Sequence, residues 1–519
     1  MAIKQAAAGR GSVGSGGVAV GVVREEAGLL HGIRSDRRLA LVATVAIAAL
    51  AGVAAGWITP RGPVTTADAL AWMGGALLIG VAGGLVMGSR WSAFVVPFVS
   101  LLAFELARLG SQGPTVDAIH LGSTYGIIAF VVGRGVTWLL AVPAMALGSI
   151  LGVEVAARSG REGKRKLGIV GWGLTGLVSV AVGGLALLLA GPASTAPIVG
   201  PDGLPLEGSI AELTTVPIGG HDQTLMIRGR SDESPVLLHL TGGPGGTDVG
   251  AMRADTGLEQ DFVVVTWDQR GTGKSYGALD PVETLTLEAM VADTIELSEY
   301  LAERFDEERI YVHGQSWGST LGVLAAQRRP DLFHAFIGSG QMVSQRETDI
   351  MFWEDTLAWA ERSGEEALAA TLRANGPPPY EDVLDYEIAL SHEHDWNAYP
   401  EFDGDKEMPF NLFVPENDLM DRVNGLRAFL DTFAVLYSQL QGIDFRHDVP
   451  SLDVPVYVVE GAHEARGRVV LADEWFEALD APSKEWIVFE HSGHRPSFEE
   501  PARFVEVMAR VLDETYPGS

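Results

Sequence analysis

The sequence contains no cysteine among its 519 residues. Disulfide bonds, thiolate metal sites and a cysteine nucleophile are therefore excluded, and cysteine usage indicates no cellular compartment. A chain of this length exceeds what one hydrophobic core ordinarily organises, so we expect at least two domains.

Basic side chains are scarce in the second part of the chain. Residues 1–197 carry 15 Lys and Arg against 8 Asp and Glu, whereas the remaining residues carry 22 against 59. So much negative charge would repel phosphate groups, which argues against a nucleic-acid partner. The contrast in charge indicates two physically different parts in one chain.

The first part contains five apolar runs with almost no charge, at about residues 39–58, 67–88, 91–107, 136–156 and 168–190. Each is close to the roughly 20 residues that a helix needs to cross the hydrocarbon core, the third being the shortest. Buried helices of a soluble protein are the alternative, which five such runs disfavour. We expect an all-α transmembrane bundle of about five helices over residues 38–190, followed by a Pro/Ser/Gly-rich linker over residues 191–207.

The basic residues predict the orientation of this bundle. Residues 1–37 are rich in Gly, Ala and Ser and are expected to form a disordered tail. With five spans this tail, Arg90 and the basic loop 158–166 fall on one side, which the positive-inside rule makes cytoplasmic. A hairpin within residues 124–156, broken at Gly133-Arg134-Gly135, would give six spans but would put the tail and the basic loop on opposite faces. We therefore expect a multi-pass protein of the cell membrane with its second part on the extracytoplasmic side.

After residue 208 short β-branched runs alternate with amphipathic helices. Strands are expected at residues 211–218, 223–228, 236–241, 262–268, 309–313, 334–337, 454–460 and 486–489, and helices at 286–305, 317–328 and 499–516. This alternation predicts an α/β fold, a mostly parallel sheet with helices on both faces. Residues 341–450 interrupt a core formed by 208–340 and 451–519, and their helical pattern predicts a cap over the carboxyl ends of the strands.

One serine lies in the pattern G-x-S-x-G, at Gly314 to Gly318 (G-Q-S-W-G). An apolar strand precedes the motif and a helix rich in Leu and Ala follows it. In the α/β-hydrolase fold such a turn holds a nucleophilic hydroxyl above the sheet, and the flanking glycines are required because side chains there would collide. A capped helix amino-terminus is the alternative, but this context favours Ser316 as a nucleophile.

A serine nucleophile needs a base and an acid, which in this fold follow it in the order acid, then histidine. His494 lies in the loop after the last expected strand, which returns to the strand ends, and His491 is the alternative. Glu464 follows the preceding strand and would orient the imidazole and balance its charge. Glu460 and Asp473 are the alternatives for the acid.

The tetrahedral intermediate of acyl transfer needs two backbone donors. We expect them from Trp317, which follows the nucleophile, and from Gly243 in the loop 241–246 (T-G-G-P-G-G), which follows a buried strand. Residues 268–275 (D-Q-R-G-T-G-K-S) resemble a phosphate loop but lack the Walker spacing, so we interpret them as a structural turn. No metal-ligand spacing stands out, and no cofactor is expected.

These three segments together resemble the proline iminopeptidase family, which carries H-G-G-P-G-G, D-Q-R-G-x-G-x-S and G-G-S-W-G-S motifs in the same order. The resemblance covers about residues 208–519 and implies a helical cap, the catalytic residues named above and cleavage of an amino-terminal residue from a short peptide. Thr241 stands where the family has histidine, Gln315 where it has glycine, and Glu464 where it has aspartate.

The family holds the free amine of its substrates with carboxylates of the cap. The candidates for that role in this chain are Glu354, Glu387 and Glu393, and an ordinary exposed helix charge is the alternative for each.

The leading hypothesis is a membrane-anchored serine hydrolase that acts on small peptides as an aminopeptidase. A carboxylesterase or amidase with the same residues is the second, since acyl transfer to Ser316 does not distinguish an amide from an ester. A non-catalytic membrane transporter or sensor with a ligand-binding domain is the third. The complete set of candidate catalytic residues argues against it, as does the lack of paired ionisable residues at mid-span.

Overall fold

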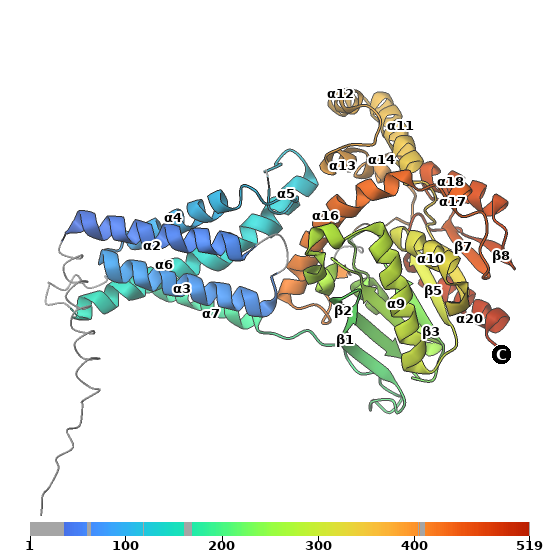
Figure 1. The fold of residues 1–519 in the computed structure, drawn as a ribbon, viewed down its shortest axis with the longest axis horizontal. Helices are drawn as coiled ribbons and strands as arrows, with labels where there is room; N and C mark the ends of the chain where they lie inside the picture. Colours follow the sequence, from blue (N-terminus) through green and yellow to red (C-terminus); the bar gives the residue numbers. More distant parts are fainter. Residues whose placement is uncertain are drawn as a thin grey trace, which may run out of the picture. The chain divides into compact units, whose positions relative to one another are not determined.

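The computed structural model describes residues 36–59, 64–117, 119–159, 169–402, 404 and 411–517. The chain folds as two compact units (Figure 1). The first consists of Met1–Ile58, Ala71–Leu109 and Trp138–Leu185, and the second of Thr59–Leu70, Gly110–Thr137 and Ala186–Ser519. Residues 1–35 of the predicted tail and residues 160–166 of the predicted basic loop lie outside the described residues.

The apolar runs of the first part form helices α2 (Arg37–Ile58), α3 (Thr66–Met87), α4 (Ser92–Ala107), α6 (Val136–Ser159) and α7 (Ile169–Leu189). Four helical segments of the described chain are long and apolar enough to cross a membrane, and α4 is a shorter apolar helix. Helix α5 (Thr124–Phe130) continues through the π-helical turn η1 (Val131–Gly135) into α6. The segment considered for a hairpin is therefore one continuous helix, with a local change of hydrogen bonding at Gly133-Arg134-Gly135.

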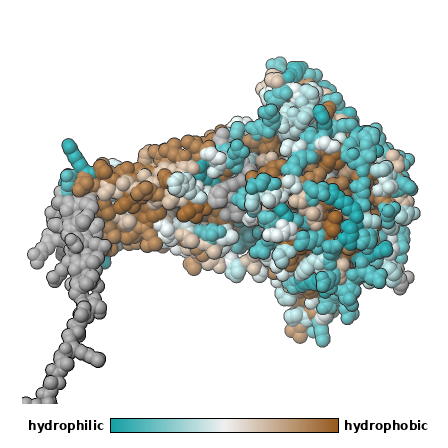
Figure 2. Space-filling model, in the orientation of Figure 1, coloured by the Kyte–Doolittle hydropathy of each residue, from teal (hydrophilic) through white to brown (hydrophobic). Residues whose placement is uncertain are grey.

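Small residues allow the apolar helices to pack closely. A Cβ atom on Gly80 of α3 would lie 2.1 Å from the carbonyl oxygen of Met145, and one on Gly84 would lie 2.1 Å from that of Ser149. Such backbone contact is typical of helix pairs in lipid, where packing replaces the hydrophobic effect. Apolar residues cover the visible face of these helices (Figure 2).

The second unit contains an eight-stranded sheet in the order β1-β2-β4-β3-β5-β6-β7-β8. Its strands are β1 (Ile210–Ile218), β2 (His221–Gly229), β3 (Val236–Leu240), β4 (Val263–Asp268), β5 (Ile310–Gln315), β6 (Phe333–Ser339), β7 (Val456–Gly461) and β8 (Lys484–Phe489). β2 pairs antiparallel with β1 and β4, and the remaining neighbours are parallel. The predicted mostly parallel sheet is confirmed.

Helices cover the sheet on both faces, because alternate side chains of each strand point to opposite sides. Helices α9 (Leu287–Phe305), α10 (Trp317–Arg328) and α18 (Arg466–Ala478) pack on one face, and α8 (Val249–Ala254) and α20 (Pro501–Thr515) on the other. Met290, Leu297 and Leu301 of α9 are fully buried, as their spacing predicts. Helix α18 was not predicted.

A helical insertion separates β6 from β7, as predicted. It contains α11 (Gln345–Ser363), α12 (Glu366–Asn375), α13 (Leu384–Leu390), α14 (Glu393–Trp396), α16 (Leu419–Leu436) and α17 (Phe445–Asp448). Helix α16 begins at a capping box in which Asp418 and Asp421 each accept the other's backbone N–H.

Candidate active site

Ser316 lies on the turn between β5 and α10 and has a strained backbone, with φ 53° and ψ −119°. Such a conformation is costly for a residue with a side chain and occurs where the surrounding structure enforces it. A Cβ atom on Gly314 would lie 2.3 Å from the carbonyl oxygen of Gly318, and one on Gly318 would lie 1.9 Å from that of Leu240. The two glycines of the motif are therefore required sterically, and the turn presents the hydroxyl at the carboxyl end of β5.

The structure brings Ser316, His494 and Glu464 together from three separate loops. His494 Nε2 lies 2.9 Å from Ser316 Oγ, and His494 Nδ1 lies 2.7 Å from Glu464 Oε2. The ionised Glu464 carboxylate can only accept, so Nδ1–H donates to it and Nε2 is left to accept the Ser316 hydroxyl proton. The Glu464 side chain is fully buried, whereas that of His494 is 22% exposed.

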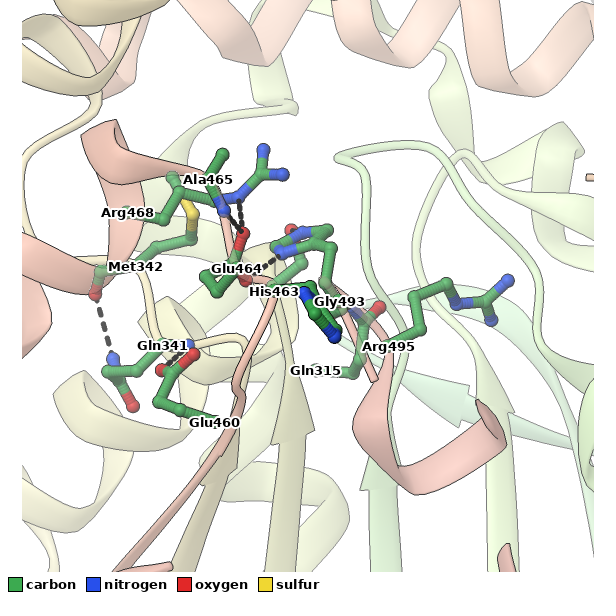
Figure 3. A network of polar contacts seen from close by, with 12 residues as sticks. Gln315, Gln341, Met342, Glu460, His463, Glu464, Ala465, Arg468, Gly493 and Arg495 are labelled. Atoms are coloured by element: carbon green, nitrogen blue, oxygen red, sulfur yellow. Dashed lines mark hydrogen bonds and ion pairs between the residues drawn. The ribbon is translucent and has the colours of Figure 1, made fainter. Parts of the chain in front are cut away.

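A buried arginine keeps Glu464 ionised. Arg468 Nε donates to Glu464 Oε1 at 2.7 Å, and the backbone N–H of Ala465 donates to the same oxygen at 2.7 Å (Figure 3). Burial alone would raise the pKa of Glu464, but the charge of Arg468 and the His494 ring outweigh it and lower that pKa. The second carboxylate oxygen remains free for the imidazole.

The alternative acids and base occupy different positions. Glu460 points toward Gln341, whose backbone N–H donates to it at 2.7 Å (Figure 3). Burial and the neighbouring Glu464 charge raise the pKa of Glu460 well above its usual range, which favours the protonated form of this carboxyl. Asp473 is exposed on α18, and the His491 side chain is 66% exposed.

The glycine loop 241–246 lies beside Ser316. A Cβ atom on Gly242 would lie 3.3 Å from Ser316 Cβ and 2.4 Å from Gln315 Oε1. Gln315 Nε2 also donates to the carbonyl oxygen of His494 at 3.3 Å. Gln315, which departs from the family motif, thus lies between the glycine loop and the histidine loop.

The D-Q-R-G turn connects the glycine loop to the turn that carries Ser316. Gln269 Nε2 donates to the carbonyl oxygen of Thr241 at 3.1 Å, and the indole N–H of Trp317 donates to Gln269 Oε1 at 2.9 Å. Thr247 donates to Asp268 at 2.6 Å, and burial raises the pKa of Asp268 to about 6. This segment is a structural turn, as predicted, and it fixes the two segments that carry Gly243 and Trp317.

Each of the three acidic residues predicted to bind a substrate amine has a partner within the protein. Glu354 is 51% exposed and pairs with Arg466 at 3.0 Å. Glu387 is buried and accepts backbone N–H groups of α5, and Glu393 pairs with Arg468. Each carboxylate is already held by a group of the protein.

Sequence analysis missed three residues that shape this site, Gln269, Gln315 and Arg468. Gln269 and Gln315 stand inside motifs that were recognised, but a motif does not say which atoms its polar side chains contact. Arg468 lies four residues after Glu464 on the unpredicted helix α18, a spacing that places two side chains on one helix face. Among the described residues no group of three or more His, Asp or Glu side chains could hold a metal ion.

The known proteins to which this chain is similar include aminopeptidases and proline iminopeptidases. The sequence profile of the family described as "Serine aminopeptidase, S33" matches residues 254–372. The probable aminopeptidase YbaC of Bacillus subtilis is 30% identical over 318 residues, covering 59% of this chain and 98% of YbaC. A proline iminopeptidase of Lactobacillus delbrueckii subsp. bulgaricus is 24% identical, covering 57% and 96%. The crystal structure of a proline iminopeptidase-related protein from Thermus thermophilus is 22% identical with a TM-score of 0.42, covering 59% and 99%.

The parallel sheet, the strained turn at Ser316 and the helical insertion define an α/β-hydrolase. The similarity to YbaC extends over nearly the whole length of YbaC and narrows the assignment from a fold to a family. The chain belongs to the serine aminopeptidase S33 family, and its proline iminopeptidase-like part is a hydrolase.

Proposed function

We propose that this protein is a membrane-anchored serine aminopeptidase that releases amino-terminal residues from short peptides through an acyl-enzyme on Ser316. The observation that carries the proposal is the unbroken series of contacts from Ser316 through His494 to the buried, ionised Glu464. A hydroxyl hydrogen-bonded to an imidazole that a carboxylate orients is the arrangement of an activated serine nucleophile.

In this mechanism Ser316 Oγ attacks the carbonyl carbon of the substrate's first residue while His494 Nε2 takes the hydroxyl proton. The backbone amides of Gly243 and Trp317 donate to the oxyanion that forms. His494 then gives its proton to the leaving amine, and the first residue remains as an ester on Ser316. Water, deprotonated by His494, hydrolyses that ester and restores the serine.

An aminopeptidase requires recognition of the substrate's free amine, and the named relatives support this activity. The engagement of Glu354, Glu387 and Glu393 by other groups favours a second candidate, a carboxylesterase or amidase with the same catalytic residues. The transporter or sensor alternative gives no reason for a strained serine in contact with a histidine.

The membrane anchoring rests on the apolar helices of the first part. Two segments that lie between these helices in the sequence, Thr59–Leu70 and Gly110–Thr137, belong to the same compact unit as the hydrolase. Their membership in that unit supports five spans with the hydrolase on the side opposite the basic loop, which is the extracytoplasmic side. Protease added to intact cells should release a fragment that contains the hydrolase, and complete protection would contradict this orientation.

Substrate class is tested with the full-length chain in detergent, on prolyl and alanyl anilides, their N-acetylated forms, and short acyl esters. The aminopeptidase predicts a kcat/KM for the free-amine anilides at least about tenfold above that for the acetylated forms, because acetylation removes the charge that the site recognises. Ester turnover without any preference for a free amine would instead establish the esterase. The Ser316→Ala variant serves as the control for contaminating hydrolases.

A further inference from the structure

Helix α16 of the cap lies between the catalytic motifs and a segment that precedes the hydrolase in the sequence. That segment, Gly110–Thr137, contains α5 and η1 and belongs to the same compact unit as α16. The contacts between this segment and α16 lie within that unit.

Arg427 of α16 is 4% exposed and binds the backbone of η1. Its guanidinium donates to the carbonyl oxygen of Val132 at 2.5 Å and to that of Gly133 at 2.8 Å. A π-helical turn displaces carbonyl groups from regular α-helical pairing, so these oxygens are suited to an outside donor. Charge-assisted bonds of this kind are about twice as strong as neutral ones.

Two buried acids of the cap bind the same segment. Asp431 of α16 accepts the Thr115 hydroxyl at 2.5 Å and its backbone N–H at 3.3 Å. Glu387 of α13 accepts the backbone N–H groups of Thr124 and Tyr125 at 2.8 and 3.0 Å. Those amides begin helix α5, where a negative charge is also favoured by the helix dipole. The burial of Glu387, which sequence analysis considered for substrate binding, is explained by this contact.

Phe429, on the same helix, contacts the glycine loop. A Cβ atom on Gly245 would lie 2.7 Å from the carbonyl oxygen of Phe429 and 2.9 Å from its Cα. The Phe429 ring meets Tyr125 of α5 edge to face, with ring centroids 6.1 Å apart. Helix α16 therefore contacts α5 and the glycine loop at the same residue.

Gly245 is in turn packed tightly against Gly243. A Cβ atom on Gly243 would lie 2.6 Å from the backbone nitrogen of Gly245 and 2.8 Å from that of Gly246. Gly243 and Gly245 have φ values of 137° and 100°, so the loop follows a path that side chains disfavour. A shift of Gly245 would change the direction in which the Gly243 amide points.

We propose that Arg427 is a positioning residue for the hydrolytic reaction. By binding the η1 carbonyls it holds the segment Gly110–Thr137 on α16, and α16 holds Gly245 and hence the oxyanion donor Gly243. This inference rests on the proposed function, which makes the Gly243 amide a donor to the oxyanion. It gives the segment between the apolar helices α4 and α6 a part in catalysis.

The test uses the full-length chain in detergent with Arg427→Gln, Arg427→Lys and Thr115→Val. Loss of one oxyanion donor typically costs 10²–10³ in turnover, so its misplacement in Arg427→Gln should lower kcat by about tenfold or more. KM should stay within about twofold, because the oxyanion exists only in the transition state. Arg427→Lys, which keeps a charged donor, should recover most of the loss. Arg373→Ala is the control, since Arg373 is an exposed arginine of the cap that pairs with Glu361.

Thr115→Val removes the hydroxyl that donates to Asp431, the neighbouring contact between α16 and the same segment, and should lower kcat in the same direction but by less. If Arg427→Gln does not fold, Thr115→Val tests whether kcat depends on holding this segment on α16, and an unchanged kcat then overturns the inference. A folded Arg427→Gln with the kcat of the Arg373→Ala control would overturn the inference, as would a rise in KM alone. Hydrolysis retained by Ser316→Ala would refute the proposed function instead, so the two failures are distinguishable.

Discussion

The replacement of Glu464 by glutamine tests the charge that the structure places behind His494. The carboxylate lies 2.7 Å from His494 Nδ1, and its side chain is fully buried. At an effective dielectric constant of about 20, two unit charges roughly 4 Å apart attract by about 4 kcal/mol, which Glu464→Gln removes from the imidazolium formed during turnover. Losing the charge-assisted hydrogen bond that fixes the tautomer adds about 1.5 kcal/mol. Together these correspond to a loss of about 10⁴ in kcat.

Glu460→Gln is the matched control. It makes the same substitution four residues away, but we expect it to leave kcat nearly unchanged. Burial and the Glu464 charge raise the pKa of Glu460, so glutamine resembles the protonated carboxyl and should leave kcat within about threefold. When the pKa of a carboxyl is higher in the folded state, the free energy of unfolding of the protein falls as the pH rises above the pKa of that group in the unfolded chain, about 4.3. The Glu460→Gln variant should therefore unfold at a higher temperature than the parent at pH 8. At pH 5 this difference in unfolding temperature should be smaller.

Both variants are assayed for kcat with the best anilide or ester substrate, and their unfolding midpoints are measured at the two pH values. The reasoning is refuted if Glu460→Gln loses more activity than Glu464→Gln. It is also refuted if Glu464→Gln retains more than about a tenth of the parent kcat, since the worked loss is about 10⁴.

Two further substitutions test the surroundings of the site. Arg468→Met should lower the free energy of unfolding by about 3–5 kcal/mol, because it removes the arginine that pairs with the buried Glu464 charge. Calorimetry measures this loss, and an unchanged unfolding midpoint would show that the ion pair is unimportant. Gly245→Ala should reduce kcat and stability more than Gly220→Ala. Both positions have positive φ, but a side chain would meet Phe429 at Gly245 and open space at Gly220. Equal effects of the two alanines would show that the contact with α16 contributes nothing.

Much of the hydrolase fold is predictable from the sequence because its elements leave local signals. The short, mostly apolar runs that become β3 and β4 are fully buried in the sheet, as is typical of parallel strands covered on both faces. The G-x-S-x-G pattern locates Ser316 because sterics allow only glycine at two fixed positions. His494 and Glu464 follow from the order of the strands, since each stands in a loop after one of them.

Contacts between distant segments were not predictable, because they depend on packing and not on local pattern. The spacing of Glu387 and Glu393 in the cap does not reveal that one meets the α5 backbone and the other meets Arg468. The association of residues Gly110–Thr137 with the hydrolase has no local signal either, as apolar periodicity predicts spans but not their loop contacts. Helix α18 was missed because charged residues interrupt its apolar face.

Active-site labelling determines whether Ser316 is the nucleophile. The full-length parent protein, incubated with a fluorophosphonate probe, should become labelled at Ser316 and lose hydrolytic activity in parallel. The Ser316→Ala variant should neither label nor hydrolyse, because its His494 has no hydroxyl to activate. Labelling of the alanine variant, or its retained hydrolysis of the parent's substrates, would contradict the account.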